Sequence, residues 1–243
     1  MKSRPMAQRN YVIHTPGELP GIRRAGQLAR QVLDELCAFV RPGLTTLQVD
    51  RHAAELFARY GATSAFYQYR GFPGQICISV NDEIVHGIGR GERILQLGDI
   101  VSIDVGVRKD GFIGDNARTV SLGPPVGEVA TLLQVTERSL MAGIAAALPG
   151  QTVYDISVAI DREIQRAGFA AVRDFVGHGC GVQLHEPPEV PNYPNRKSRE
   201  RLRPGMVLAI EPMVNAGTHR SPSIRTAGRC APPTGGSPPT SNT

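Results

Sequence analysis

The sequence predicts a mixed α/β (α+β) fold made of two successive units, each with two helices followed by short strands. Apolar residues at helical spacing predict four helices, over residues 20–40, 46–60, 128–148 and 153–167. Short apolar segments bounded by Gly, Pro or Asp predict strands over 76–80, 100–107, 117–122, 172–176, 181–185 and 207–212. Because the same order occurs twice, we interpret the chain as a duplicated unit folded into one domain.

Turn residues delimit the helices of each unit. Thr15 and Glu18 have capping-box spacing, but Pro20 fits badly in a helix that begins so early, so its first turn can start on either side of Pro20. The segment Arg41-Pro42-Gly43 ends this helix, and Gly61 stops the second. In the second half, Pro149-Gly150-Gln151-Thr152 separates the helices in the same way.

Two turns organise the strands of the first unit. The turn at Leu97-Gly98-Asp99 precedes the strand over 100–107, and Lys109-Asp110-Gly111 separates that strand from the next. We therefore expect the strands over 100–107 and 117–122 to pair as a hairpin. Gly123-Pro124-Pro125 closes this half of the chain.

Composition excludes several classes of protein. The 243 residues are 41% hydrophobic and 20% charged, as in globular proteins, with neither a disordered nor a fibrous bias. No apolar run is long enough to span a membrane, and no apolar core follows the basic N-terminus, so we expect a cytoplasmic protein. The net charge of +5 indicates a solvated basic face, with contact to RNA-rich surfaces as the alternative. The cysteines lie far apart, and we expect reduced thiols, at Cys37, Cys77, Cys180 and Cys230.

The domain is expected to cover residues 12–219, between an N-terminal extension (1–11) and a C-terminal tail (220–243). Within the tail, 16 of 24 residues are Pro, Gly, Ser or Thr, and no acid is present. Such a segment has almost no large apolar side chains to bury, so we expect it to be disordered.

Four residues at turn or strand positions have side chains that bind divalent cations. Asp104 lies in the strand over 100–107 and Asp115 follows eleven residues later, so a hairpin brings the two carboxylates together. His178 has glycines on both sides, and Glu211 follows an apolar run. Carboxylates suit hard cations and can bridge two of them, and one imidazole suits a transition metal. The combination favours a metal site.

Each of the four also has a structural explanation when taken singly. Asp104 can end a strand and accept turn hydrogen bonds, and Asp115 can stabilise an Asx turn. His178 can simply belong to a glycine-rich loop. Glu211 lies among apolar neighbours and needs a partner for its charge if it is buried.

These residues belong to a set of motifs that carries a family resemblance, in the order Tyr69-Arg70-Gly71-Phe72-Pro73, Asn81-Asp82-Glu83-Ile84-Val85-His86-Gly87, Asp104 with Asp115, Gly177-His178-Gly179, His185-Glu186-Pro187 and Glu211-Pro212-Met213. The ordered set resembles the type I (bacterial) methionine aminopeptidases, which are metallopeptidases with the pita-bread fold. The resemblance implies a pseudo-twofold arrangement of the two units around a curved antiparallel sheet. It also implies removal of the initiator methionine from nascent chains with a small second residue.

The resemblance further implies two divalent metal ions (Co, Mn, Fe, Zn or Ni). Asp104 then holds one ion, Asp115 bridges both, and His178 and Glu211 bind the other. Glu211 is also the expected proton carrier. The implied partners are nascent N-termini. The basic surface would also suit work near the ribosome, and we expect a monomer.

Substrate contacts are implied for five more residues. His86 and His185 are expected to contact the substrate and to stabilise the tetrahedral intermediate. Tyr69, Phe72 and Cys77 are expected to line a small apolar pocket for the methionine side chain.

The C-terminal tail departs from the family. The family has a second bridging Glu some thirty residues beyond Glu211, whereas no acid follows Glu211 in this chain. Read two bases later, the codons of residues 225–234 permit Asp-Gly-Trp-Thr-Val-Arg-Thr-Ala-Asp-Gly, and those of 238–243 permit Ser-Ala-His-Phe-Glu-His. We hypothesise that the tail is an out-of-frame translation, and the loss of a bridging carboxylate and of edge strands can leave the encoded protein inactive or poorly folded. Resequencing of the locus tests this, because an uninterrupted frame that encodes the tail would disprove it.

Two other functions stay open. An aminopeptidase of the same fold can cleave before proline, although the segment over 81–86 argues against it. A pita-bread module without metals can instead bind peptides or proteins. The missing Glu favours this second alternative, and the retained donor residues, Asp104, Asp115, His178 and Glu211, oppose it.

Overall fold

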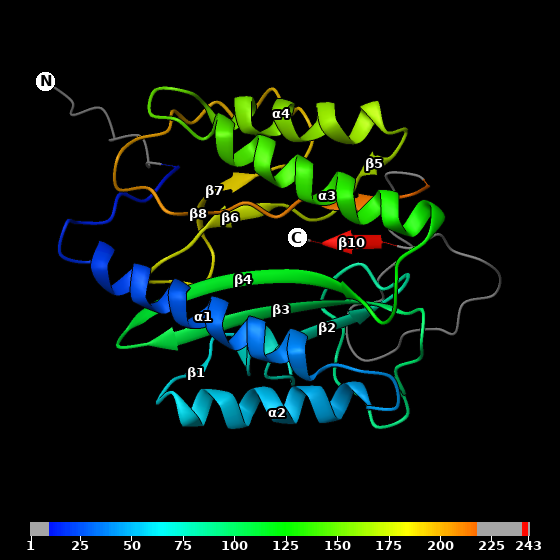
Figure 1. Cartoon of the computed structure of the whole chain (residues 1–243). Helices are drawn as coiled ribbons and strands as arrows, with labels where there is room; N and C mark the ends of the chain where they lie inside the picture. The colour runs from blue at the N-terminus through cyan, green and yellow to red at the C-terminus, as the bar shows by residue number, and fades with distance from the viewer. Residues whose placement is uncertain (1–9, 218–239, 243) are drawn as a thin grey trace, which may run out of the picture.

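The computed structural model describes residues 10–217 and 240–242. The helices are α1 (Leu19–Phe39), α2 (Thr46–Arg59), α3 (Gly127–Ala146) and α4 (Val153–Arg166). Figure 1 shows α3 and α4 side by side in the upper half of the molecule, and α1 and α2 in the lower half, with strands between them. No helix in the described residues is both long and apolar enough to cross a membrane.

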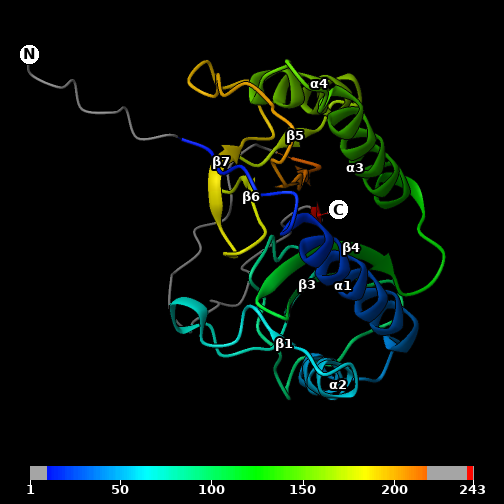
Figure 2. The same ribbon diagram turned by 90° about the vertical axis from the view of Figure 1, so that its left-hand side faces the viewer.

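The strands of the first half are β1 (Thr63–Ser64), β2 (Cys77–Val80), β3 (Ile100–Lys109) and β4 (Phe112–Ser121), with a short 3-10 turn, η1 (Tyr69–Gly71). They form one antiparallel sheet in which β3 is central, between β4 on one side and β1 and β2 on the other. The predicted hairpin is confirmed, and β4 begins earlier than expected, directly after the turn. Helix α1 packs over β3 and β4, as Figure 2 shows from the side.

The strands of the second half are β5 (Ala170–Ala171), β6 (Gly177–Gly179), β7 (Glu186–Val190), β8 (Leu208–Ala209), β9 (Met213–Asn215) and β10 (Thr240–Asn242). They form two further antiparallel sheets, with the strand orders β10-β9-β5 and β7-β6-β8. The strands are thus antiparallel, as expected, but they are divided over three small sheets.

Equivalent hydrogen bonds at the start of α2 and α4 confirm the duplication. Thr45 and Thr152 cap these helices, each through a reciprocal capping box with the residue three positions later. Thr45 forms an isolated bridge with Ile94, and Thr152 forms the matching bridge with Arg201. The two units therefore share the helix-turn-helix geometry that the Pro-Gly turns predict.

The structure shows on which side of Pro20 helix α1 begins. Thr15 N and Oγ1 donate to Glu18 Oε2 at 2.7 and 2.8 Å, so the capping-box contacts exist. The helix nevertheless begins only at Leu19, and Pro20 lies in its first turn. Proline is tolerated there because the first amides of a helix have no partner within it.

Three expectations for the second half are wrong. The segment over 181–185 is irregular, because the Glu186 carboxylate accepts the amides of Val182 and Gln183 and so removes them from a strand ladder. The strand expected over 172–176 is confined to β5, just before it. The strand expected over 207–212 is reduced to β8, and Pro212, which has no N–H to donate, lies between β8 and β9.

The domain limits meet the described residues only in part. Residues 1–9, 218–239 and 243 lie outside the description, and with them most of the N-terminal extension and of the tail. Disorder was expected through residue 243, but Thr240, Ser241 and Asn242 form β10. They pair with Asn215, Val214 and Met213 of β9, because an unpaired strand edge offers backbone donors and acceptors whatever the side chains.

The core of the described residues has one large apolar cluster in each half and two smaller clusters that combine residues of both halves. One of the smaller clusters contains Cys77 of β2, Ile113 of β4, and Cys180 and Leu184 from the segment after β6. Cys37, Cys77 and Cys180 are free thiols, as expected. This shared cluster lies where the two halves meet.

Glycine at position 114 allows α1 to approach β4. A Cβ at Gly114 would lie 2.3 Å from the backbone of Ala25, so the helix must move to admit it. We expect Gly114→Ala to lower the free energy of unfolding by about 1–3 kcal/mol, measured by urea denaturation. The matched control is Gly26→Ala on α1, where a Cβ meets nothing within 4 Å and the higher helix propensity is stabilising by up to about 1 kcal/mol. Equal effects of the two changes would contradict this packing.

Candidate metal centre

The hairpin places Asp104 and Asp115 on one face of the sheet. Asp104 pairs with Ala117 across the strands, and Gly106 pairs with Asp115. The two aspartates are therefore diagonal neighbours, close enough for their side chains to meet. The contact between their carboxyl groups favours the protonated form of Asp104 and the ionised form of Asp115.

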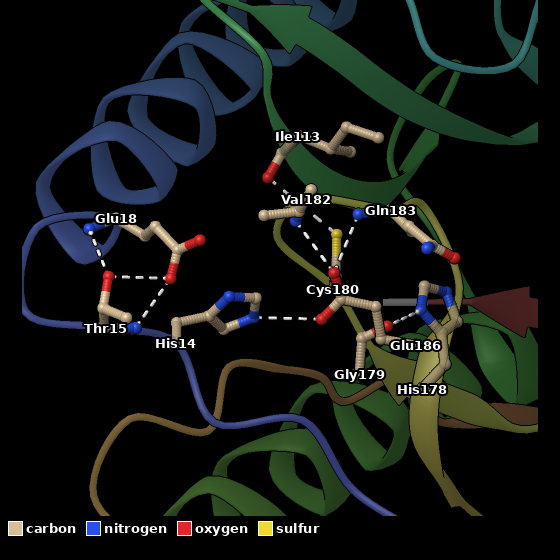
Figure 3. Close-up of polar contacts among 10 residues, drawn as sticks. All are labelled: His14, Thr15, Glu18, Ile113, His178, Gly179, Cys180, Val182, Gln183 and Glu186. Carbon is tan, nitrogen blue, oxygen red and sulfur yellow. Dashed lines mark hydrogen bonds and ion pairs between the residues drawn. The ribbon is translucent and has the colours of Figure 1, made fainter.

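His178 comes to the same place from β6. Its Nδ1 lies 2.9 Å from its neighbour's carbonyl, Gly179 O (Figure 3). Its Nε2 is left to face two carboxylates, 3.2 Å from Glu211 Oε1 and 3.8 Å from Asp115 Oδ2. A ring nitrogen fixed by a carbonyl, with the other directed at acids, is the usual arrangement of an imidazole that binds a metal.

Glu211 enters from the segment between β8 and β9. Its backbone carbonyl accepts a hydrogen bond of 2.7 Å from Nδ2 of Asn192, which is fully buried. Its Oε1 is buried and makes no hydrogen bond of proper geometry, although His178 Nε2 lies near it. An acceptor of this kind is expected where a cation binds.

Burial and crowding disfavour negative charge in this cluster. Burial and the charges of Asp115 and Glu211 raise the pKa of Asp104 well above its usual range. Burial raises the pKa of Asp115, against the opposing effect of His178. Burial and the charge of Asp115 raise the pKa of Glu211 well above its usual range. Ionising all three carboxylates therefore requires added positive charge.

The donor set suits divalent cations, but the side chains now contact one another. Within residues 10–217 and 240–242, no three His, Cys, Asp or Glu side chains already surround a common point as ligands. A cation that binds here must replace the contacts of His178 with Asp115 and Glu211. The orphaned oxygen of Glu211, the fixed ring of His178 and the raised carboxylate pKa values all fit such an exchange.

His185 and His86 lie beside this cluster as neutral imidazoles. The His185 ring centroid is 4.3 Å from that of His178, and its Nδ1 lies 2.9 Å from the Tyr69 hydroxyl. Burial and the charges of His178, Arg70 and His86 lower the pKa of His185 to about 4. Burial also lowers the pKa of His86, whose ring meets Phe175 edge-on at 5.3 Å.

Tyr69, Phe72 and Cys77 lie together, as expected of residues that share a site. Tyr69 and Phe72 pack against the cluster that contains Cys77 and Cys180. Cys77 also pairs with Asp104 in the β2–β3 register. Burial, followed by the charges of Asp104 and Asp115, raises the pKa of the Cys77 thiol. Their role as a pocket for methionine stays a prediction.

Cys180 also lies near the acids. Burial and the charges of Asp115, Glu186 and Glu211 raise the pKa of its thiol. Sequence reasoning missed Asn192 and Phe175, which hold Glu211 and His86. No sequence signal identifies them, because an Asn and a Phe in irregular segments are common surface and core residues.

Comparison with known proteins agrees with this geometry. Residues 20–229 match metallopeptidase family M24. The chain is 44% identical to methionine aminopeptidase 1 of Bacillus subtilis over 207 residues, which are 85% of this chain and 83% of that protein. It is 39% identical to the methionine aminopeptidase of Escherichia coli strain K12 over 206 residues, covering 84% and 78%.

Solved structures give the same result. The methionine aminopeptidase of Thermotoga maritima has a TM-score of 0.88 and 36% identity, covering 96% of this chain and 93% of its own. That of Rickettsia prowazekii has a TM-score of 0.86 and 32% identity, covering 95% and 89%. The prolidase of Pyrococcus furiosus, with a TM-score of 0.72 and 24% identity over 84% and 58%, shares the fold. The chain therefore belongs to metallopeptidase family M24, in the group that contains the methionine aminopeptidases.

Proposed function

We propose that the protein is a metal-dependent aminopeptidase that removes the N-terminal methionine from chains with a small second residue. One observation carries the proposal: three carboxylates and one imidazole, from β3, β4, β6 and the segment after β8, meet beside two neutral histidines. The names of similar proteins indicate the substrate, since methionine aminopeptidases of four bacteria cover most of this chain.

Asp104, Asp115, His178 and Glu211 would hold the divalent cations, two in number, of Co, Mn, Fe, Zn or Ni. When bound, such cations polarise a peptide carbonyl and lower the pKa of a bound water. In the described residues the donor set has these four members, which together would hold both cations.

The chain's own groups supply the remaining functions. Glu211 can hold a proton at its carboxyl group, because burial and the charge of Asp115 raise its pKa well above the usual range. His86 and His185 are neutral at pH 7, so each has one ring N–H to donate to the oxygen of the tetrahedral intermediate. Tyr69, through its contact with His185 Nδ1, helps to fix which nitrogen carries that proton.

The setting we propose is the cytoplasm, where the protein acts as a monomer on nascent N-termini. The formal charge of +5 would favour work near the anionic ribosome surface. For the tail over residues 220–243, the out-of-frame origin stays our proposal.

Peptide cleavage separates the candidate functions. Incubation with Met-Gly-Met and Mn²⁺ or Co²⁺ is expected to release free methionine, detected by mass spectrometry, and EDTA is expected to stop the reaction. An Ala-Pro peptide is expected to stay intact. Cleavage of the Ala-Pro peptide alone would instead indicate a proline-directed enzyme. Binding of Met-Gly-Met without cleavage at any cation concentration would indicate a peptide-binding module.

A further inference from the structure

A buried contact outside the donor set joins the N-terminal segment to the loop that carries His185. His14 Nε2 lies 3.0 Å from Glu186 Oε2, and the two side chains are only 2% and 5% exposed (Figure 3). The atoms are at ion-pair distance, while the ring N–H lies outside hydrogen-bond geometry. A buried carboxylate is costly without a partner, so the placement of Glu186 depends on His14.

The other oxygen of Glu186 closes the loop before it. Glu186 Oε1 accepts hydrogen bonds from Val182 N at 2.8 Å and from Gln183 N at 2.7 Å. The last residue of this loop is His185, directly before Glu186. One carboxylate therefore fixes the start of the loop at its first oxygen and contacts His14 at its second.

His14 is itself anchored from several directions. Its amide donates to Gly205 O at 2.8 Å, and Val12 N donates to Pro187 O at 3.1 Å. A Cβ on Gly181 would lie 2.6 Å from the His14 ring, so the ring fills the space that glycine leaves. The next residue, Thr15, is tied to the start of α1 by its contacts with Glu18. The loop is thus connected to α1 through His14.

His185 needs this support because its own side chain has few contacts. The residue as a whole is exposed although its ring is partly desolvated, and the ring contacts the Tyr69 hydroxyl at 2.9 Å and the His178 ring at 4.3 Å between centroids. We propose that His14 and Glu186 are a positioning pair, which fixes the loop over 181–185 and so holds His185 against Tyr69 and His178. The pair lies outside the four donor residues, and its kinetic consequence rests on the proposed function.

The first test needs no activity. His14→Ala is expected to accelerate hydrogen exchange at the Val182 and Gln183 amides by at least about tenfold and to shift the NMR signals of the His185 imidazole. His14→Lys places the three N–H donors of an ammonium group within reach of Glu186 and is expected to restore both readouts. Glu163→Gln, which removes a carboxylate from an exposed pair on α4, is the matched control and is expected to change neither. Unchanged exchange and unchanged His185 signals in folded His14→Ala would overturn the proposal.

The second test asks whether the pair acts through His185. With Met-Gly-Met, His14→Ala is expected to lower kcat by about 10- to 100-fold, because small misplacements of a group at the reacting atoms have effects of this size. KM is expected to stay within about twofold, and in a His185→Ala background the same change is expected to add less than about twofold. An equal loss of kcat in both backgrounds would show a merely structural role. If the parent protein cleaves no Met-Gly-Met, the proposed function fails, while the exchange and NMR results still decide on the pair.

Discussion

Replacing His178 by alanine is expected to lower kcat/KM for Met-Gly-Met about 1,000-fold, equivalent to about 4 kcal/mol of transition-state stabilisation. His178 is the one nitrogen donor in the proposed ligand set, and its Nδ1 contact fixes the ring so that Nε2 faces Asp115 and Glu211. Without it, the proposed ligand set loses its one nitrogen donor. The measurement is steady-state kinetics at saturating Mn²⁺, together with the Mn²⁺-induced rise in Tm, which we expect to disappear.

The matched control for this change is His52→Ala. His52 lies on α2, where its ring stacks on that of Phe39 and contacts the Glu55 carboxylate. It does not belong to the proposed ligand set. We expect His52→Ala to keep both the activity and the Mn²⁺-induced rise in Tm. Full activity in the His178 variant at low Mn²⁺ would show that His178 is not a ligand.

Replacing Asp104 by asparagine is expected to stabilise the protein when cations are removed by EDTA, and the gain should grow from pH 5 to pH 8. The folded-state pKa of Asp104 is raised, so its contribution to stability is full below the unfolded value near 4 and is lost as pH rises towards the folded value. An amide at this position has no proton to lose. At pH 8 we expect a Tm at least about 4 °C above that of the parent protein, equivalent to about 1 kcal/mol or more.

Two comparisons sharpen this test. The lowered pKa values of His86 and His185 reduce the stability of the folded protein as pH falls below 6.5. Both histidines are present in the parent and in the variant, so their effect cancels in the difference between the two Tm values. The control is Asp34→Asn, since contacts with Arg30 and Arg118 lower the pKa of this exposed carboxyl group. Asp34→Asn is expected to leave the Tm unchanged or to lower it slightly, and this difference is not expected to grow above pH 5. With saturating Mn²⁺ the sign for Asp104→Asn should reverse, and a gain that is independent of pH and Mn²⁺ would contradict the account.

Local patterns predicted the first half of the fold well. The hairpin of β3 and β4 is determined by its turn, where Asp110 and Gly111 both have positive φ, at 51° and 82°. The helices are determined by apolar spacing and by Thr45 and Thr152, which act within one turn of chain. Such signals lie within a few residues of the element they determine, so a single sequence contains them.

In the second half, local sequence signals do not determine every element. The segment over 181–185 has the apolar composition of a strand, but the Glu186 carboxylate holds it as a loop, and His14 holds that carboxylate from the other end of the chain. β10 likewise depends on the free edge of β9 and on no apolar pattern of its own. Contacts between distant segments override local preference at both places.

The candidate site divides in the same way. The hairpin alone brings Asp104 and Asp115 together, and this follows from sequence reasoning. Whether His178 and Glu211 reach the same place depends on how β6 and β8 pack against the first half. Local sequence patterns do not contain this packing, and the family resemblance supplied it. Neither the sequence patterns nor the family resemblance identified Asn192 and Phe175, because these residues matter through their contacts with Glu211 and His86.

The most direct test of the central claim is a crystal structure with Mn²⁺, measured near the manganese absorption edge. Anomalous density bounded by the carboxylates of Asp104 and Asp115, His178 Nε2 and the Glu211 carboxylate is the predicted result. Manganese bound elsewhere, with this cluster still closed on itself in crystals of a protein that cleaves Met-Gly-Met, would contradict it.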